Sequence, residues 1–289
     1  MKTDQLRLDY KSPYDFEALL SWFRFHQIPD LEQIDDSTYS RVISTSKGLG
    51  WFQVSHDKKR HSLQVTLAGA ALKDRAKLES GIRRMFDVDA DPKLIGKAMY
   101  ADAGLKSLWA RYPGLRVARA WSGYESIITT ILGQLVSVSF GRLLVCELMT
   151  GVGAKALHPQ TGVPIHLFPT PERLASANLS SVRTSPMRRN AIKTVAKVIR
   201  DGVFDWQTPV DPKALRKTLL SIPGIGAWTA EYIAMRGFHD DDAFPSTDYG
   251  LKQELVRRPK VQVDRVRPWR AYAAASLWRS YGDAKRQAR

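Results

Sequence analysis

The sequence predicts a mostly helical protein that begins with a small α+β domain. Two patterns carry this prediction. Apolar and polar residues alternate in parts of residues 1–88, as they do on half-buried strands, whereas strand patterns nearly vanish from about Asp89 onward. With 289 residues the chain has the length of two or three compact domains. Its 44% hydrophobic and 25% charged composition is typical of a globular protein.

The first domain is expected to combine strands with two helices. Leu6, Leu8 and Tyr10 alternate with polar residues and predict a strand. Two short apolar segments flank a polar tip at residues 56–60 and predict a β-hairpin. In chain order we expect a strand at 6–10, a helix at 14–25, the hairpin strands at 51–54 and 63–67, and a helix at 71–86.

The rest of the chain reads as amphipathic helices separated by clusters of Gly, Pro or Asp. The connection at residues 151–168 contains Gly, Pro and His and has no helical pattern. The expected helices lie at about 92–103, 104–110, 123–150, 171–177, 187–201, 211–220, 227–236, 247–257 and 268–281.

The chain is strongly basic, with 44 Lys and Arg against 29 Asp and Glu and a formal net charge of +15. This balance predicts a polyanionic partner. No run of about 18 apolar residues is present, which argues against a membrane span. Because the first residues lack the apolar core of a signal peptide and Cys146 is the single cysteine, we expect a cytoplasmic protein without a disulfide. One cysteine cannot hold a four-cysteine iron–sulfur cluster, and the six histidines lack zinc-site spacing.

The segment from Leu219 to Ala230 reads as the end of one helix, a tight turn and the start of the next. Gly224 and Gly226 allow backbone angles and close approaches that a Cβ would block. Such a turn directs the amides of a helix N-terminus toward an anion, for example a DNA phosphate. Taken alone, the Pro-Gly-x-Gly pattern more often marks an ordinary connection between two helices.

Asp248 is the candidate catalytic carboxylate. It follows Phe244 and Pro245, which interrupt any helix, and it precedes a segment that can begin one. An acid at the positive end of a helix dipole tends to stay ionised. The simpler interpretation is an ordinary N-cap, the usual role of Asp at such a position. Asp240, Asp241 and Asp242 are adjacent acids that repel one another, and we expect them in a solvated loop.

Seven segments together resemble the helix-hairpin-helix DNA glycosylase superfamily, and within it the AlkA-type 3-methyladenine DNA glycosylases. The resemblance covers nearly the whole chain and depends on the joint order and spacing of the segments. They are Pro13 to Asp15, Tyr112 to Arg116, Ile131 to Val138, Phe168 to Pro171, Leu219 to Ala230, Phe244 to Tyr249 and Pro268 to Ala273.

The resemblance implies an architecture and a reaction. The helical body would form two subdomains flanking a cleft, one from residues 89–112 and 237–289 and one from 113–236, with the helix-hairpin-helix at about 212–236. The reaction would be excision of an alkylated base, and Asp248 would stabilise the positive charge that develops on the sugar. Members that also cut the backbone carry a lysine two residues after the second hairpin glycine, where this chain has Trp228, so the resemblance implies a monofunctional enzyme that leaves an abasic site.

The same resemblance implies an aromatic base pocket, since alkylated purines such as 3-methyladenine and 7-methylguanine carry positive charge that stacked rings favour. Trp228 and Tyr232 are four residues apart and share a helix face. The alternative is that these aromatic residues belong to the core. The expected pocket residues are Trp228, Tyr232, Trp269, Tyr249 and, from the first domain, Trp22.

Leu135 matches the apolar wedge that fills the gap left by a flipped nucleotide, and Gln134 precedes it; an unplaced leucine is otherwise a core residue. Gly224, Gly226 and the amide of Thr229 would hold a DNA phosphate. By resemblance, a structural monovalent cation would bind main-chain carbonyls, and these are the carbonyls of Leu220, Ile222 and Ile225.

Several basic residues are further candidates for phosphate contacts, although a run of charge more often marks a solvated face. They are Arg188, Arg189, Lys193 and Lys197 on one helix, Lys252 beyond Asp248, and a basic tail at 285–289. The segment from Arg183 to Met187 lacks the glycine that family members usually have there, which puts one secondary DNA contact in doubt.

The expected partner is double-stranded DNA with alkylated bases, bound by a monomer that needs no obligate protein partner, membrane or cofactor other than that cation. Two alternatives stay open. One is a catalytically silent DNA-binding protein that uses the hairpin only to dock phosphates. The other is a glycosylase on the same scaffold with a different lesion preference.

Overall fold

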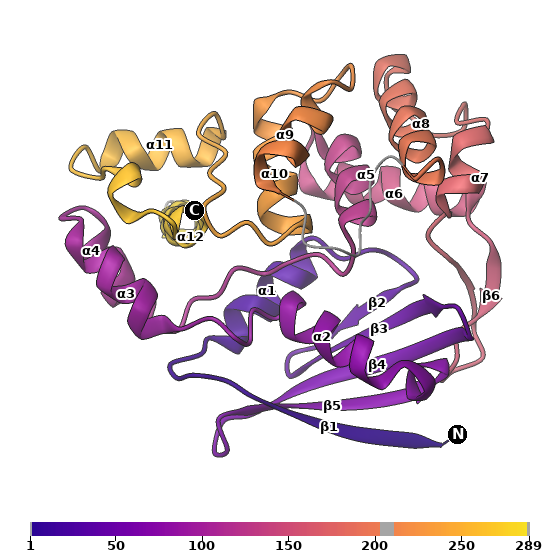
Figure 1. The fold of residues 1–289 in the computed structure, drawn as a ribbon, viewed down its shortest axis with the longest axis horizontal. Coiled ribbons are helices and arrows are strands. Elements are labelled where there is room, and N and C mark those ends of the chain that lie inside the picture. The colour runs from indigo at the N-terminus through magenta and orange to yellow at the C-terminus, as the bar shows by residue number, and fades with distance from the viewer. Residues whose placement is uncertain (1, 203–210, 288–289) are drawn as a thin grey trace.

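The computed structural model describes residues 2–202 and 211–287. A curved sheet from the N-terminal part lies along one side of the molecule, and a body of helices lies along the other (Figure 1). The fold is therefore mostly helical with an N-terminal α+β part, as the sequence predicts.

The sheet has five antiparallel strands in the order β1-β5-β4-β3-β2. The predicted hairpin of the fourth and fifth strands is confirmed, and Val54 pairs with Val65. The second and third strands were not predicted, because their residues lack a regular alternation over enough positions. The strands are β1 (Thr3–Asp9), β2 (Glu32–Ile34), β3 (Thr38–Thr45), β4 (Gly48–Asp57) and β5 (Ser62–Gly69).

Helices α1 (Phe16–Phe25) and α2 (Arg75–Met85) build the first hydrophobic core against this sheet. Leu8 from β1 and Phe23 from α1 are among its buried residues. Asp15 caps α1, and its carboxylate accepts a hydrogen bond from the amide of Ala18. The predicted helix at 71–86 is confirmed, although its first turn is the 3-10 helix η1 (Ala70–Asp74).

The helical body has its own larger core. Every helix predicted beyond residue 89 is present, with bounds shifted by a few residues, except that one predicted helix is divided in two. The helices are α3 (Pro92–Ala101), α4 (Leu105–Arg111), α5 (Gly123–Gly133), α6 (Val138–Val152), α7 (Pro171–Ser176), α8 (Pro186–Arg200), α9 (Pro212–Leu220), α10 (Ala227–Gly237), α11 (Tyr249–Arg257), η2 (Val263–Val266) and α12 (Arg270–Gln287).

The single helix predicted at 123–150 is wrong. The chain breaks between α5 and α6, whose axes differ by 120°. Leu135 has a φ of +55°, a left-handed conformation that no α-helix accommodates. Ser137 then starts α6, because its hydroxyl accepts a hydrogen bond from the amide of Phe140. The connection at 151–168 also contains a small hairpin of β6 (Lys155–Leu157) and β7 (Pro164–His166) that was not predicted.

The helix-hairpin-helix consists of α9, a turn and α10. On the other side of the body, α4 packs on α12 and α3 packs on η2. A hydrogen bond from the Tyr112 hydroxyl to Asp283 (2.7 Å) joins the end of α4 to α12. Segments far apart in sequence are thus neighbours, while the domain boundaries themselves stay a prediction.

A buried ionic cluster joins the sheet to the body. Arg41 on β3 pairs with Glu32 on β2 and with Glu125 on α5, and the Arg41 side chain is almost wholly buried. The Tyr39 hydroxyl also donates to Glu32, at 2.6 Å. Because breaking one partner of a buried pair leaves an uncompensated charge, this cluster fixes α5, and the loop that follows it, relative to the N-terminal sheet.

Across the described ranges, no helix on its own combines the length and apolar character of a membrane span. The α5–α6 pair reaches that length and composition only together and strongly bent.

Candidate active site

Asp248 lies directly before α11, and its carboxylate accepts three hydrogen bonds. Oδ1 accepts from the amide of Leu251 (3.0 Å) and from the indole Nε1 of Trp278 (2.8 Å). Oδ2 accepts from the indole Nε1 of Trp228 (3.1 Å). The side chain is half-buried. Asp248 is therefore an N-cap and at the same time the anion at the centre of an aromatic cluster.

Three aromatic rings surround this carboxylate. The rings of Trp228 and Tyr232 are stacked, with centroids 5.2 Å apart and planes inclined by 21°. The rings of Tyr232 and Trp278 meet edge to face at 6.0 Å. Two of the predicted pocket residues, Trp228 and Tyr232, are thus brought together with Asp248.

Trp278 was not predicted. The sequence predicts Trp269 for the pocket. Its ring contacts Tyr272 at 5.9 Å, and among the described residues no hydrogen bond or ring contact joins it to Asp248. Trp269 lies directly before α12, whereas Trp278 lies within that helix, nine positions later. A tryptophan within the terminal helix itself was the signal that could have identified it.

The other two predicted pocket residues lie at the edges of the cluster. Tyr249 is exposed and packs edge to face against Tyr281, with centroids 6.4 Å apart. Trp22 on α1 stacks on His26, with centroids 4.2 Å apart. The guanidinium of Arg236, a residue that was not predicted for the site, lies against the rings of Trp22, Tyr232 and Trp278.

Burial lowers the pKa of His26 to about 4, and the positive charges of Arg236 and Arg142 act in the same direction. An unfolded histidine has a pKa of about 6.5. Below that value the unfolded chain binds a proton that the folded chain rejects, so stability falls as the pH falls from 6.5 toward 4.

We expect this single group to lower the free energy of unfolding by about 2 kcal/mol between pH 7 and pH 5. Urea denaturation at both pH values checks the prediction. The variant His26→Gln serves as the non-titrating control and should lose that part of the pH dependence. An equal slope in both proteins would contradict the assignment.

The loop between α5 and α6 presents Leu135 fully to solvent, and the residue is 99% exposed. Gln134 holds the loop, because its Nε2 donates to the carbonyl of Gly224 (3.0 Å) and to the hydroxyl of Thr229 (2.8 Å). Arg188 supports it from the other side through the carbonyl of Gln134. The exposure of Leu135 excludes a core position for this residue. The side chain of Gln134 is hydrogen-bonded to the hairpin.

The hairpin turn depends on its first glycine. Gly224 has a φ of +93°, in the left-handed region that glycine favours. Gly226 is the N-cap of α10 and offers no side chain to the first amides of that helix. These amides, including that of the buried Thr229, are the groups that an anion would meet.

The main-chain carbonyls suggested for a cation lie in this turn. That of Ile222 already accepts a hydrogen bond from the amide of Ile225, at 3.0 Å. This hydrogen bond closes the turn directly. Binding of a cation by the carbonyls of Leu220, Ile222 and Ile225 stays a prediction. In the ranges 2–202 and 211–287, His, Cys, Asp and Glu side chains form no group of three that could hold a metal ion.

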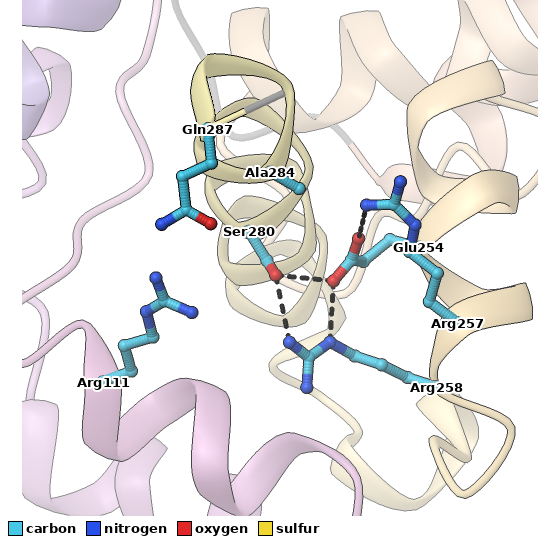
Figure 2. Close-up of a pocket in the computed structure, with 7 residues that line it drawn as sticks. All are labelled: Arg111, Glu254, Arg257, Arg258, Ser280, Ala284 and Gln287. Carbon is cyan, nitrogen blue, oxygen red and sulfur yellow. Dashed lines mark hydrogen bonds and ion pairs between the residues drawn. The ribbon is translucent and has the colours of Figure 1, made fainter. Parts of the chain in front are cut away.

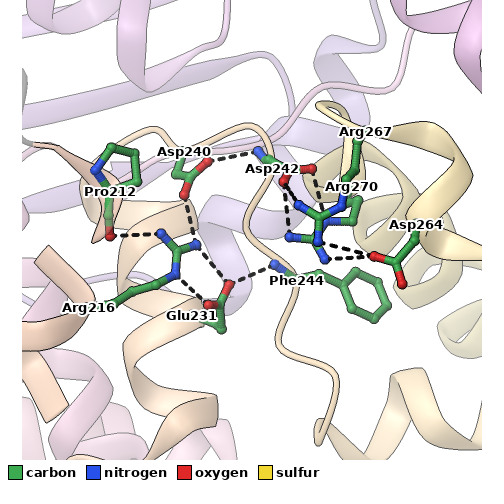
Figure 3. Close-up of polar contacts among 9 residues, drawn as sticks. All are labelled: Pro212, Arg216, Glu231, Asp240, Asp242, Phe244, Asp264, Arg267 and Arg270. Atoms are coloured by element: carbon green, nitrogen blue, oxygen red, sulfur yellow. Dashed lines mark hydrogen bonds and ion pairs between the residues drawn. The ribbon is translucent and has the colours of Figure 1, made fainter. Parts of the chain in front are cut away.

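The prediction that Asp240, Asp241 and Asp242 form a solvated, mutually repelling loop is wrong. Each carboxylate pairs with arginine from another element. Asp240 pairs with Arg216 of α9 at 2.8 Å, and Figure 3 shows this contact beside Glu231. Asp241 pairs with the buried Arg119. The expected repulsion among the three carboxylates is offset, because arginines distant in sequence approach them from different directions.

Asp242 anchors the start of α12. Its carboxylate accepts two hydrogen bonds from Arg270 (2.9 and 3.0 Å) and also pairs with Arg267 (Figure 3). Nearby, the amide of Phe244 donates to Glu231 at 3.0 Å. The connector from α10 to α11, which ends in Asp248, is therefore fixed to α10 through Glu231 and to α12 through Arg270.

We expect Asp242→Asn to lower the free energy of unfolding by about 1–2 kcal/mol, because hydrogen bonds to charged groups contribute more than neutral ones. Asp264 pairs with the same two arginines at 3.2 Å, but its side chain is 81% exposed. Asp264→Asn is thus a matched control, with an expected loss below about 0.5 kcal/mol. Urea denaturation of both variants measures the difference, and equal losses would contradict the anchoring role.

The basic helix α8 uses two of its four candidate residues internally. Arg189 donates from Nε and Nη2 to the carbonyl of Val182, at 3.2 and 2.8 Å, and Arg188 holds the Leu135 loop as described. Lys193 is partly buried, while Lys197 and, on α11, Lys252 are exposed. Phosphate contacts by these residues stay predictions.

A cavity of about 270 Å³ lies away from Asp248, where α4, α11 and α12 end (Figure 2). Arg258 donates to Glu254 (2.7 Å) and to the Ser280 hydroxyl (3.1 Å). Arg111 and Arg257 lie in the last turns of their helices, where cations favourably face the negative end of the helix dipole. The carboxylate of Glu254 and the negative ends of the α4, α11 and α12 dipoles therefore explain why arginines gather at this cavity.

The chain is similar to known proteins over nearly its whole length. Residues 5–122 match the family model of the AlkA N-terminal domain. The chain is 30% identical over 283 residues to DNA-3-methyladenine glycosylase 2 of Escherichia coli K12, covering 95% of this chain and 97% of that protein. It is 31% identical to a probable bifunctional transcriptional activator/DNA repair enzyme AlkA of Mycobacterium tuberculosis H37Rv, covering 96% of this chain and 57% of that longer protein.

Solved structures show the same fold. A 3-methyladenine DNA-glycosylase from Archaeoglobus fulgidus superposes with a TM-score of 0.77 at 18% identity, covering 96% of this chain and 98% of that one. A Clostridium acetobutylicum 8-oxoguanine glycosylase/lyase bound to double-stranded DNA superposes with a TM-score of 0.68 at 16% identity, covering 95% and 93%. With its helix-hairpin-helix, its helix-capping aspartate and a match to the Escherichia coli enzyme over 95% of its length, the chain belongs to the AlkA family of DNA-3-methyladenine glycosylases.

Proposed function

We propose that this protein is a monofunctional DNA glycosylase that removes alkylated bases from double-stranded DNA in base excision repair. The observation that carries the proposal is the carboxylate of Asp248, held by the indole N–H groups of Trp228 and Trp278 beside stacked rings. The relatives named for 3-methyladenine glycosylase activity supply the substrate class.

Cleavage of the bond between the sugar and the base leaves positive charge on the sugar. A fixed carboxylate in a site that excludes much of the water stabilises that charge. Oδ1 of Asp248 already accepts two hydrogen bonds, whereas Oδ2 accepts one from Trp228. An ionised carboxylate oxygen can accept about two, so Oδ2 keeps room for the sugar or for an attacking water.

Access to the base requires that the nucleotide leaves the stack. Leu135 is the side chain that would fill the gap, because it is apolar and wholly exposed on a fixed loop. The free amides at the start of α10 would hold a phosphate, and the net charge of +15 favours DNA in general. We also propose that the protein acts as a monomer.

The proposal includes the absence of strand cleavage. A backbone-cutting mechanism of this superfamily needs an amine that attacks the sugar. The side chain two residues after Gly226 is Trp228, whose indole N–H is committed to Asp248. Borohydride should therefore trap no covalent complex with lesion DNA, and a trapped complex would overturn this part of the proposal.

The decisive experiment measures free bases released from methylated DNA by chromatography. We expect 3-methyladenine and 7-methylguanine in the supernatant and an intact, alkali-sensitive DNA backbone. A catalytically silent DNA-binding protein would release no base. Release of an oxidised base from control DNA, with none from methylated DNA, would identify a glycosylase of different preference.

A further inference from the structure

A buried cation lies among the rings of the proposed base pocket. Trp228, Tyr232 and Arg236 are spaced by four residues on α10 and so follow one face of that helix. The Cζ atom of Arg236 lies 4.5 Å from the ring centroid of Trp22, 5.3 Å from that of Trp278 and 5.6 Å from that of Tyr232. One guanidinium thus contacts three of the rings near Asp248.

This guanidinium has few polar partners. Arg236 is 5% exposed, and its Nη1 donates to the carbonyl of Ala118 at 2.7 Å. Its Nε is buried without a hydrogen-bond partner among the described residues. Within the same residues no carboxylate lies at ion-pair distance from it, in contrast to Arg41 and Arg119, which are equally buried but paired. The ring faces are therefore a main compensation for burying this charge.

Arg236 and Asp248 place opposite charges on two sides of Trp278. The indole Nε1 donates to Asp248 at 2.8 Å, while the face of the ring lies against Arg236. A base bound among these rings would have the anion at its sugar end and the cation beneath it. Such a field acts on any charge that moves between sugar and base.

We propose that Arg236 determines lesion specificity, by stabilising the electron density that leaves with the base and by opposing bases that already carry a positive charge. The inference rests on the proposed function. When the glycosidic bond breaks, its electron pair goes to the base nitrogen, and water adds hydroxide to the sugar and gives up a proton. A neutral lesion base leaves as an anion, which Arg236 stabilises, and it then takes a proton from solvent.

A cationic base, such as 7-methylguanine, leaves as a neutral molecule and gains less from this residue. Before the bond breaks, it also meets rings against which the positive charge of Arg236 already lies. Aromatic rings alone would favour the cationic base. The resident guanidinium therefore shifts the balance of this pocket toward neutral lesions.

The test compares single-turnover release of hypoxanthine, a neutral lesion, with release of 7-methylguanine from the same duplex. In Arg236→Met the ratio of the hypoxanthine rate to the 7-methylguanine rate should fall about tenfold. In Arg236→Lys, which keeps the charge, it should stay within about threefold of the unmodified protein. Arg173→Met is the control, because Arg173 also donates to a backbone carbonyl, that of Val152, away from the rings.

A purely structural Arg236 would slow both reactions equally, and an unchanged ratio in Arg236→Met overturns the proposal. A second measurement needs no variant. The unmodified protein is bound to 2′-fluoro duplexes that carry either 7-methylguanine or its neutral isostere 7-methyl-7-deazaguanine. The cationic base should bind no more than about threefold tighter, and a larger preference overturns the proposal. If the unmodified protein releases no base at all, the proposed function fails first, and this affinity comparison still tests Arg236.

Discussion

Replacing Asp248 with asparagine should slow base release at least about 10³-fold while the protein stays folded. Asparagine caps helices about as well as aspartate, so the bond to the Leu251 amide has a replacement. The negative charge, however, is lost. In the native protein, both carboxylate oxygens of Asp248 accept a hydrogen bond from a tryptophan indole. In the variant, the amide NH₂ replaces one of these oxygens, so two N–H donors face each other. This substitution thus removes the charge that the proposed reaction needs, while it leaves the structure almost unchanged.

Single-turnover release of 3-methyladenine measures the loss, and binding to the same DNA and thermal denaturation show whether the variant is intact. Asp15→Asn is the matched control, because Asp15 caps α1 through the Ala18 amide at 2.9 Å and no indole contacts its carboxylate among the described residues. The control should release bases at the normal rate. Normal release by the Asp248 variant would mean that the carboxylate has no part in the chemistry.

The predicted site residues that the structure brings together were predicted from patterns that are local in the chain. Trp228 and Tyr232 share a helix face by their spacing, and Asp248 follows a helix-breaking Phe-Pro pair at the start of a helix. Short-range rules suffice for such residues. Their approach to one another depends on the packing of α11 and α12, which no local pattern encodes.

Trp278 shows what the sequence could not supply, because it reaches the site from α12 by tertiary packing. Arg236 follows Tyr232 by four residues on α10, so its helix face could be predicted, but its burial against Trp22 and Trp278 depends on tertiary packing. By composition both resemble ordinary surface or core residues. The prediction for the three adjacent acids between α10 and α11 was wrong for a related reason. Their arginine partners come from α9, α12 and the segment before α5.

The division of α5 from α6 was missed because apolar residues continue at helical spacing through Leu135. Periodicity records which positions are apolar and cannot register a single left-handed residue. The resemblance nonetheless assigned Leu135 a role outside the core, and its exposure agrees with that assignment. A fully exposed leucine in an unfavourable backbone conformation is a feature that function, more often than stability, explains.

Shortening this side chain in Leu135→Ala should therefore leave the free energy of unfolding unchanged, within about 0.5 kcal/mol. Base release from duplex DNA should fall about 10- to 100-fold, because unstacking a base costs a few kcal/mol that the wedge helps to offset. The same lesion opposite a mismatched base should lose much less, since a damaged or mismatched pair already opens more easily.

Leu157→Ala provides the control, because Leu157 is also an exposed leucine, 62% accessible, but lies on β6. It should match the unmodified protein on both DNA substrates. The comparison between paired and mismatched lesions separates two roles for Leu135. A wedge acts on the opening of the duplex, so its loss depends on how firmly the lesion is paired. An equal loss on both substrates would instead mean that Leu135 contributes to binding or chemistry after the base has left the stack.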